Sequence, residues 1–474
     1  MPIAIKLALR TIARRKGRMA LIGSLVAFGT FLIVFGSIFA SSTASASRAA
    51  IIGKFTGDFI VYSARSKELP SPFAFQTPLP PIRDLERVET ALDAVPEIAA
   101  YAPYAQNYGV VQARRDGRTF DLPIIYYAID PVSYAKVFGA LKSVEGDYFG
   151  LSADGIAAEG KARGGVMVSA FQNAQYKKNY GVELRAGEDV TVLGVTEGGV
   201  NSARSTVSGV FVPERYASVF NYINFMDAST YAAVYNYSGV SSLPESLDKS
   251  LAKADSGEDA IFALASDPGA GTVDVSSLKA ERLSGATMIA VRLKPGASAK
   301  DAIARIESDP SLGVRVAAWS EASGFYAQVS AGLQAFVLVA TALVFLVVAM
   351  IFMNTLIINV TERTTEIGTM RAIGAERSFV RDVFLAESLA LNMAAAAVGL
   401  VASGVAALAF SRSGVTLPDV VSQFLVGGGS IPIRATPWPF VAGALVVALV
   451  SVLATLYPVR VATGITPLKA MSGR

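Results

Sequence analysis

The sequence predicts an α-helical membrane domain with four transmembrane helices and, between the first and second of them, a large mixed α+β extracytoplasmic domain. The chain has 474 residues, of which 52% are hydrophobic and 17% are charged. Soluble domains usually carry about a quarter charged residues. Four apolar runs are long enough to cross a bilayer, while one region of roughly 280 residues contains no such run. We therefore expect a membrane protein with a large water-facing part.

A basic segment precedes the first apolar run. Residues 1–18 form this cytoplasmic lead-in, and residues 19–40 then match the roughly 20 apolar residues needed to cross a bilayer. Ile3 and Leu7 also favour an amphipathic helix on the membrane surface. A cleaved signal peptide is the alternative, because residues 44–46 resemble a cleavage site. The apolar region of a signal peptide usually has only about 7–15 residues, which favours the span.

Residues 48–325 form the expected α+β domain, with room for two subdomains. Short runs rich in β-branched residues lie there between Gly, Asp and Pro, as strands do. The alternation of Ile289, Val291 and Leu293 predicts a strand with one buried face. A proline-rich linker is expected over residues 69–81. The predicted strands cover residues 59–64, 118–129, 166–169, 190–193 and 207–212, and the predicted helices cover residues 85–95 and 300–306.

An aromatic segment and a polar segment follow each other in this region. Residues 216–237 are rich in Tyr and Phe, and residues 241–283 are poor in aromatic side chains. The aromatic segment is open to two interpretations. It packs in a core or against another subunit, or it forms a patch that touches lipid or an apolar substrate. The polar segment is expected to be a surface insertion.

Three further apolar runs lie in the last third of the chain. The first of them has roughly 28 residues and exceeds the bilayer requirement of about 20, so we expect it to project beyond the lipid. The next is rich in Ala and Gly, which permits close helix packing and predicts a subunit interface. The expected spans are residues 331–359, 384–410 and 438–457, with a loop at residues 411–437 that contains a small amphipathic piece at residues 420–425.

The distribution of cations predicts the orientation. The lead-in, the segment 361–381 and the tail 458–474 are basic, and with four spans all three lie on the same side of the membrane. Both termini are therefore expected in the cytoplasm and the large domain outside. Glu387, near the inner end of the third span, either snorkels or pairs with Arg381, or it makes a contact that positions the helix.

The segment 361–381 carries the strongest pattern in the chain. It is dense in charge, yet Ile367, Met370 and Ile373 recur at a three-residue spacing, as one face of a short helix requires. Gly374 suits the end of that helix. A plain solvated loop that only joins two spans is the alternative, but such a loop needs no apolar stripe.

The last third of the chain resembles the FtsX-like permeases, membrane subunits of ABC transporters of the MacB, LolC and LolE type. The resemblance rests on Asn354 to Leu356, on the motifs from Glu362 to Ala375, on Glu387, and on the ending from Pro458 to Ala470. Residues 165–168, 180–192 and 205–211 are similar to the MacB-like periplasmic core. The resemblance implies that the helix seats in a cytoplasmic ATPase through Glu362, Arg363, Glu366, Ile367, Gly368, Met370, Arg371, Ala372, Ile373 and Gly374.

Composition limits the chemistry of this chain. It contains neither Cys nor His, so it offers no thiolate, no imidazole base and no Cys or His metal site. The sequence has no phosphate-binding GxxxxGK[ST] motif. We expect a non-catalytic subunit without a cofactor of its own, with ATP and Mg bound by a separate ATPase. A net charge of +4 is too small to predict nucleic-acid binding.

The resemblance implies the partners and the location. They are a dimer of ABC ATPase subunits, a second permease copy or a homologous permease, membrane lipid and a lipoprotein cargo, in the bacterial inner membrane. The expected function is ATP-driven release or export of a lipoprotein or another amphiphile. The alternative is a mechanical relay that regulates cell-wall hydrolases and transports nothing. A receptor with a ligand-binding domain fits the outer region but leaves the last three spans without a purpose.

Overall fold

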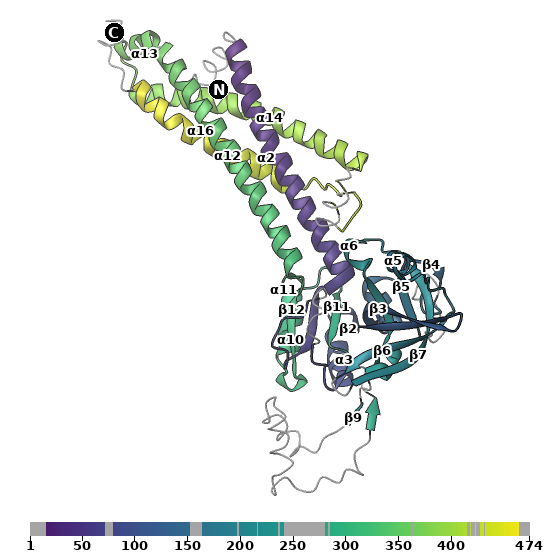
Figure 1. Cartoon of the computed structure of the whole chain (residues 1–474). Coiled ribbons are helices and arrows are strands. Elements are labelled where there is room, and N and C mark those ends of the chain that lie inside the picture. The colour runs from purple at the N-terminus through teal and green to yellow at the C-terminus, as the bar shows by residue number, and fades with distance from the viewer. Residues whose placement is uncertain are drawn as a thin grey trace. The chain divides into compact units, whose positions relative to one another are not determined.

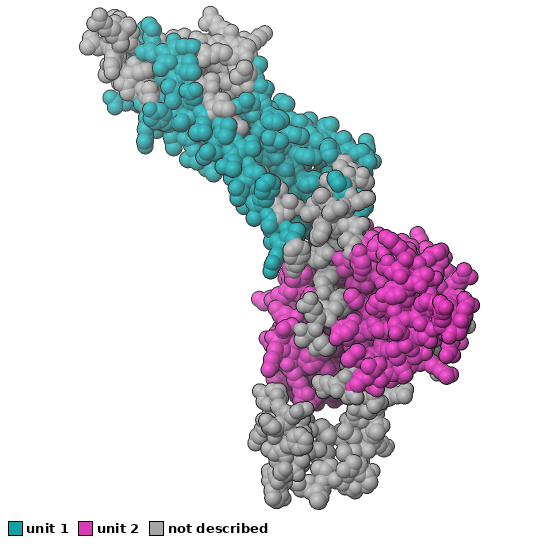
Figure 2. All heavy atoms as spheres, in the orientation of Figure 1, with its two compact units in different colours: residues 1–48, 328–474 teal, residues 49–327 magenta. Residues whose placement is uncertain are grey.

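The computed structural model describes residues 16–71, 79–151, 164–196, 199–215, 217–235, 238–240, 280–282, 285–362, 364–414, 418, 422, 427–430 and 432–463. The chain divides into two compact units, one of residues 1–48 with 328–474 and one of residues 49–327 (Figure 2). Most of the polar insertion, of the proline-rich linker and of the lead-in lies outside the described residues, as does part of the loop 411–437. Those expectations stay predictions.

Long helices make up the first unit (Figure 1). Among the described residues, three stretches are long and apolar enough to cross a membrane: Gly23–Thr56, Arg377–Ser413 and Pro437–Pro458. The fourth expected span lies in α12, where residues 326–361 include no charged residue. The count of four spans and their limits stay predictions. The helices are α2 (Lys16–Ile51), α12 (Phe325–Glu362), α13 (Thr364–Ala372), α14 (Arg377–Ser413) and α16 (Pro437–Thr463).

Small residues let these helices approach closely. A Cβ atom at Gly399 of α14 would lie 2.4 Å from the carbonyl oxygen of Ala27 in α2. A Cβ atom at Gly443 of α16 would lie 2.4 Å from Cγ2 of Val34, also in α2. Without a hydrophobic driving force in lipid, close packing of this kind holds helices together. Gly399 therefore packs within the chain, and the subunit interface expected for the third span stays a prediction.

Polar side chains connect α14 with α16. The amide nitrogen of Asn392 donates to Oγ of Ser451 at 2.8 Å, and Oγ1 of Thr455 donates to Oγ of Ser388 at 3.2 Å. The hydroxyl of Ser451 in turn donates to the carbonyl oxygen of Val447. Oδ1 of Asn392 is buried and has no hydrogen-bond partner among the described residues. Hydrogen bonds between apolar helices fix their rotation, because unpaired polar groups are costly in hydrocarbon.

The second unit is built on a mixed sheet of ten strands. Its order is β12-β1-β11-β2-β3-β8-β5-β7-β4, and β6 pairs with β2 and β7. A separate two-stranded sheet joins β9 (Ser238–Val240) to β10 (Ala280–Arg282). The strands of the large sheet are β1 (Phe59–Ser63), β2 (Ile98–Arg115), β3 (Arg118–Ile129), β4 (Ser143–Gly146), β5 (Val166–Ser169), β6 (Asp189–Thr196), β7 (Gly199–Phe211), β8 (Ile223–Asp227), β11 (Met288–Leu293) and β12 (Val314–Ala318).

Short helices cap the sheet and connect its strands. Asp130 and Ser169 accept hydrogen bonds from backbone N–H groups in the first turns of α4 and α5, which satisfies donors that a helix cannot use internally. The helical elements are η1, a π-helical turn (Ile52–Thr56), α3 (Leu85–Asp93), α4 (Pro131–Phe138), α5 (Ala170–Tyr180), α6 (Ala217–Phe220), α7 (Ala228–Tyr235), α10 (Ala299–Glu307), η3 (Pro310–Leu312) and α11 (Trp319–Ala322).

The longest pair of strands, β2 and β3, is a hairpin closed by two residues. Arg115 pairs with Arg118, and the intervening Asp116 and Gly117 have φ angles of 50° and 73°. Two positive φ angles define the tight turn whose twist matches that of the strands, and glycine adopts it without strain. The sequence prediction of a strand over residues 118–129 is confirmed, and so is the one over residues 166–169.

The prediction for β11 is wrong in one respect. The alternation of Ile289, Val291 and Leu293 predicts one buried face, but Ile289, Ala290 and Val291 are all fully buried. The strand lies between β1 and β2 in the sheet, and apolar clusters cover both of its faces. A small Ala290 side chain on the second face gives no periodic signal, which is why the pattern is misleading.

The aromatic segment packs largely in the core. Phe225 is fully buried, and Phe220 and Tyr231 are 4% and 1% exposed. The Phe220 ring stacks on Phe55 at a centroid distance of 4.7 Å. The core interpretation is thus confirmed for these residues, while Tyr222 is 52% exposed. Tyr216 and Tyr237 lie outside the described residues.

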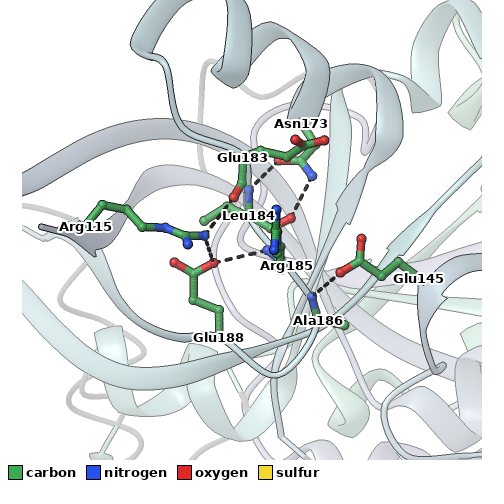
Figure 3. A network of polar contacts seen from close by, with 8 residues as sticks. All are labelled: Arg115, Glu145, Asn173, Glu183, Leu184, Arg185, Ala186 and Glu188. Atoms are coloured by element: carbon green, nitrogen blue, oxygen red, sulfur yellow. Dashed lines mark hydrogen bonds and ion pairs between the residues drawn. The ribbon is translucent and has the colours of Figure 1, made fainter.

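A polar network holds the loop between α5 and β6 (Figure 3). The Arg115 guanidinium donates to Oε2 of Glu188 at 2.8 Å and to the carbonyl oxygen of Glu183 at 3.0 Å. The Asn173 amide accepts from the backbone N–H of Leu184 and donates to its carbonyl oxygen, both at 2.8 Å. The network provides hydrogen-bond partners for backbone groups of a loop that lies outside the strand pairings. Its role is structural.

Candidate functional site

The segment that the sequence singles out lies between two long helices of the first unit. Helix α12 ends at Glu362, α13 covers Thr364–Ala372, and α14 begins at Arg377. Hydroxyls of three threonines donate to backbone carbonyls of the preceding turn: Thr361 to Ile358 at 2.8 Å, Thr364 to Thr361 at 2.7 Å and Thr369 to Thr365 at 3.1 Å. Such bonds bend helices, which favours the change of direction here.

A glycine ends α13, as the sequence predicts. Gly374 has a φ of 101°, which side-chain-bearing residues rarely adopt. The N–H of Ala375 donates to the carbonyl oxygen of Met370 at 3.0 Å. This bond spans six residues around a left-handed position, the arrangement of the Schellman cap. The chain therefore stops the helix sharply and turns towards α14.

The apolar stripe of the segment divides at the cap. Ile367 is fully buried, Met370 is half-buried, and Ile373 is 87% exposed. The prediction that the three residues form one helical face is therefore wrong. The helix ends at Ala372, so Ile373 lies in the turn after the helix and not on its apolar face. Buried Ile367 anchors the helix, whereas Ile373 is largely exposed in the turn that follows.

Charged side chains surround this exposed isoleucine in the sequence. Glu376 and Arg377 are exposed, and Nε of Arg381 contacts Oδ1 of Asp382 at 2.8 Å, with both side chains more than half exposed. An exposed pair of this kind contributes little to stability. The charges indicate a water-facing segment. A contact between Arg381 and Glu387 stays a prediction, because nothing is described of the Glu387 side chain.

The structure places the other predicted coupling residues on or next to α13. Glu362 is exposed at the end of α12, Gly368 is buried, and Ala372 is exposed. Glu366 and Arg371 belong to α13, and nothing is described of their side chains. Arg363 lies outside the described residues. The hydrogen bonds of Thr361, Thr364 and Thr369 were not predicted, although the spacing of three and five residues between these threonines is a signal in the sequence.

Comparison with protein families covers nearly the whole chain. Residues 338–467 match the FtsX-like permease C-terminal domain. Residues 20–309, more than half of the chain, match the MacB-like periplasmic core domain. The chain belongs to the FtsX-like permeases of MacB type. It is an ABC transporter permease, and its match to the MacB-like core runs from within α2 to residue 309, ahead of α12, α14 and α16.

Named relatives share short parts of this permease. The macrolide export ATP-binding/permease protein MacB of Rhodopirellula baltica is 28% identical over 163 residues, which is 34% of this chain and 22% of that protein. An uncharacterized ABC transporter permease of Methanocaldococcus jannaschii is 28% identical over 140 residues, 29% of this chain and 32% of that protein. The MacB protein of Sodalis glossinidius is 31% identical over 121 residues, 25% of this chain and 16% of that protein. The matches thus span a third or less of these relatives.

Proposed function

We propose that this permease couples ATP hydrolysis by a separate ABC ATPase to movements of its outer domain, and that the movements release or export a lipoprotein or another amphiphile. The observation that carries the proposal is Ile373, an isoleucine 87% exposed at the turn that ends α13. The segment from Glu362 to Gly374 is the coupling helix of this proposal. The chain itself is non-catalytic, and ATP and Mg bind to the partner.

Ile373 has the properties of an anchor for a partner protein. Burying an isoleucine side chain that was in water contributes about 1.5–3 kcal/mol. The left-handed cap at Gly374 holds the residue in place, so little conformational entropy is lost when a partner covers it. An exposed apolar side chain in the turn after a short helix can enter a hydrophobic groove on a second protein.

The helices on either side can transmit a displacement. Helix α12 has 38 residues and α14 has 37. At about 1.5 Å per residue, each is longer than the roughly 30 Å hydrocarbon core of a bilayer. Closure of two ATPase subunits on ATP would push α13, and the attached helices would carry the displacement through the membrane. The proposed complex has two permease copies, identical or homologous, and two ATPase copies.

Recovery of partners from mild detergent tests this function. A tagged chain is purified after crosslinking, and co-purifying proteins are identified by mass spectrometry. An ATPase together with a lipoprotein is the expected result. An ATPase with a cell-wall hydrolase instead would replace transport with the mechanical relay. Repeated recovery of no ATPase would refute the coupling proposal.

Charge reversals then locate the contact. Glu366→Lys and Arg371→Glu should reduce recovery of the ATPase while membrane insertion is unchanged, because the reversed charges oppose the partner's complementary surface. Arg412→Glu is the matched control, since Arg412 is an exposed arginine in the last turn of α14, at the opposite end from α13. Equal recovery in all three variants would exclude α13 as the contact.

A further inference from the structure

An exposed apolar face of the large sheet carries an inference about the second unit. It lies on four neighbouring strands, in the order β3-β2-β6-β7. On β2, Val111 and Ala113 belong to a buried cluster that also contains Val192 of β6. Because successive side chains of a strand point to opposite faces, Tyr108 and Val110 lie on the other face of the sheet.

Strand pairing extends this second face from β3 to β7. Residues directly opposite each other in a ladder point to the same face, and so do alternate residues of one strand. Three pairs of apolar residues follow one another across the four strands in this way. We call these six residues the apolar band, and its pairs are Tyr108 with Ile125, Val110 with Leu193, and Val195 with Val200.

The apolar band is largely exposed. Val200 and Val195 are 65% and 62% exposed, and Tyr108 and Ile125 are 49% and 37% exposed. The other two members are half-buried. Helices α5 and α7 supply buried side chains to the cluster on the opposite face. The band is thus one continuous apolar surface and not a set of scattered side chains.

The size of the band selects among occupants. Strands lie about 4.8 Å apart, and alternate residues of a strand lie about 7 Å apart. Four strands and two rows of side chains therefore cover about 19 by 14 Å, on the order of 300 Å². A stable complex of two proteins buries about 800 Å² on each partner. The band is too small to hold a second protein by itself, but an extended alkyl chain can lie across its strands.

A cation lies at one corner of the band. Arg204 follows Val200 by four residues on β7, so both side chains lie on the same face. The Arg204 side chain is exposed, and no ion pair among the described residues includes it. A guanidinium group binds a carboxylate or a phosphate through two parallel hydrogen bonds.

The carboxylates nearest to the band already have donors. Oδ1 of Asp121 accepts from Nε2 of Gln112 at 2.7 Å, on the β3 side. Oδ1 of Asp189 accepts from Oγ1 of Thr206 at 3.3 Å, on the β7 side. The charge that this face offers to a ligand is therefore the positive charge of Arg204, which favours an anionic head group.

We propose that the apolar band binds the alkyl chain of an anionic amphiphile, whose head group contacts Arg204. The chain crosses the band from β7 towards β3 and covers side chains that are otherwise in water, which is favourable. This inference rests on the proposed function for the class of cargo. It narrows that class to amphiphiles with a carboxylate or a phosphate next to an extended alkyl chain.

Photolabelling of the full chain in phosphatidylcholine nanodiscs tests the proposal. The probe is dodecanoic acid with a diazirine at the methyl end, and labelled peptides are identified by mass spectrometry. The expected result is saturable labelling of β2 and β3, near Tyr108 and Ile125. Label on α16 is the internal reference for probe dissolved in the bilayer. Unlabelled dodecanoate should compete about fivefold better than dodecyltrimethylammonium, because the latter lacks the anion that Arg204 binds.

Two variants locate the contacts. Val200→Ser should weaken binding about tenfold through lost apolar contact, and Arg204→Gln about fivefold through lost charge. Val144→Ser is the matched control, because Val144 is 58% exposed but lies on β4, at the edge of the sheet away from the band. All three positions are exposed, so the melting temperatures should change little.

Four results would overturn the proposal. They are the absence of saturable labelling on β2 and β3, labelling of Val200→Ser and Arg204→Gln equal to that of the wild type, equal competition by the anionic and cationic amphiphiles, and a crosslinked dimer joined through β6 or β7, which would assign the band to a second copy. The assay contains no ATPase. Normal ATPase recovery without labelling would refute this binding site alone, whereas labelling without ATPase recovery would refute the coupling and leave the site intact.

Discussion

Replacing Ile373 with alanine removes the most exposed of the large apolar side chains that the structure describes. The change deletes three carbon groups, each worth about 0.8 kcal/mol when buried. With 87% of the residue still exposed, nearly all of this gain remains for a partner to supply. Ile373→Ala should therefore weaken ATPase binding by about 2 kcal/mol, or about 30-fold. Stability of the chain should change by less than about 0.5 kcal/mol, as at other surface positions.

The assay is a titration of the solubilised permease with the ATPase recovered alongside it, read by biolayer interferometry, with thermal unfolding of each variant in parallel. Val200→Ala is the control, because Val200 is 65% exposed but belongs to β7 of the second unit. Ile367→Ala should behave in the opposite way, since Ile367 is fully buried and its loss costs about 2–5 kcal/mol of stability. Wild-type affinity in the Ile373 variant would refute the argument.

Three further predictions concern packing and charge. Gly399→Ala should lower the melting temperature in detergent, because the new Cβ atom would overlap the backbone of α2. Gly404→Ala is the control and should leave the melting temperature unchanged, since the nearest atom to a Cβ there is 3.7 Å away. Equal melting temperatures of the two variants would contradict this prediction. Burial raises the pKa of Glu89, so the folded state keeps a proton that the unfolded chain releases, and stability should fall as pH rises above 4.5. Glu89→Gln should lose that decline in a pH series of melting curves; an unchanged slope would argue against it. Ser451→Ala should lower the free energy of unfolding by about 1 kcal/mol more than Asn392→Leu, because only Ser451→Ala leaves the buried Asn392 amide without its acceptor. A larger loss of unfolding free energy for Asn392→Leu in urea would contradict this prediction.

Local sequence patterns predict the strands whose apolar runs have clear boundaries. The strands over residues 118–129 and 166–169 have apolar runs bounded by turn residues, and both are found. Strand β2 was missed, because its apolar alternation is interrupted by Pro103 and by polar residues from Gln106 to Gln112 that pair along the sheet. Neighbouring strands decide its conformation, and their pairing cannot be read from one segment.

The candidate site, too, is predicted from the sequence only in part. The spacing of Ile367 and Met370 and the glycine after Ile373 predict a short helix with a sharp end, and the structure has both. The exposure of Ile373 depends on the helix stopping one residue before it. The proximity of Glu89 to Asp130 has no signature in the sequence, because α3 and the start of α4 come together only in the folded domain.

The sheet of the second unit has its first and last strands side by side. Phe59 of β1 lies opposite Ala318 of β12 in an antiparallel pair, so the chain enters and leaves this unit at the same edge of its sheet. A unit with adjacent ends can be inserted, removed or exchanged without separating the segments that flank it. A linker of a few residues could therefore close the gap that excision of this domain leaves, and the corresponding domain of another permease could be grafted at the same two points.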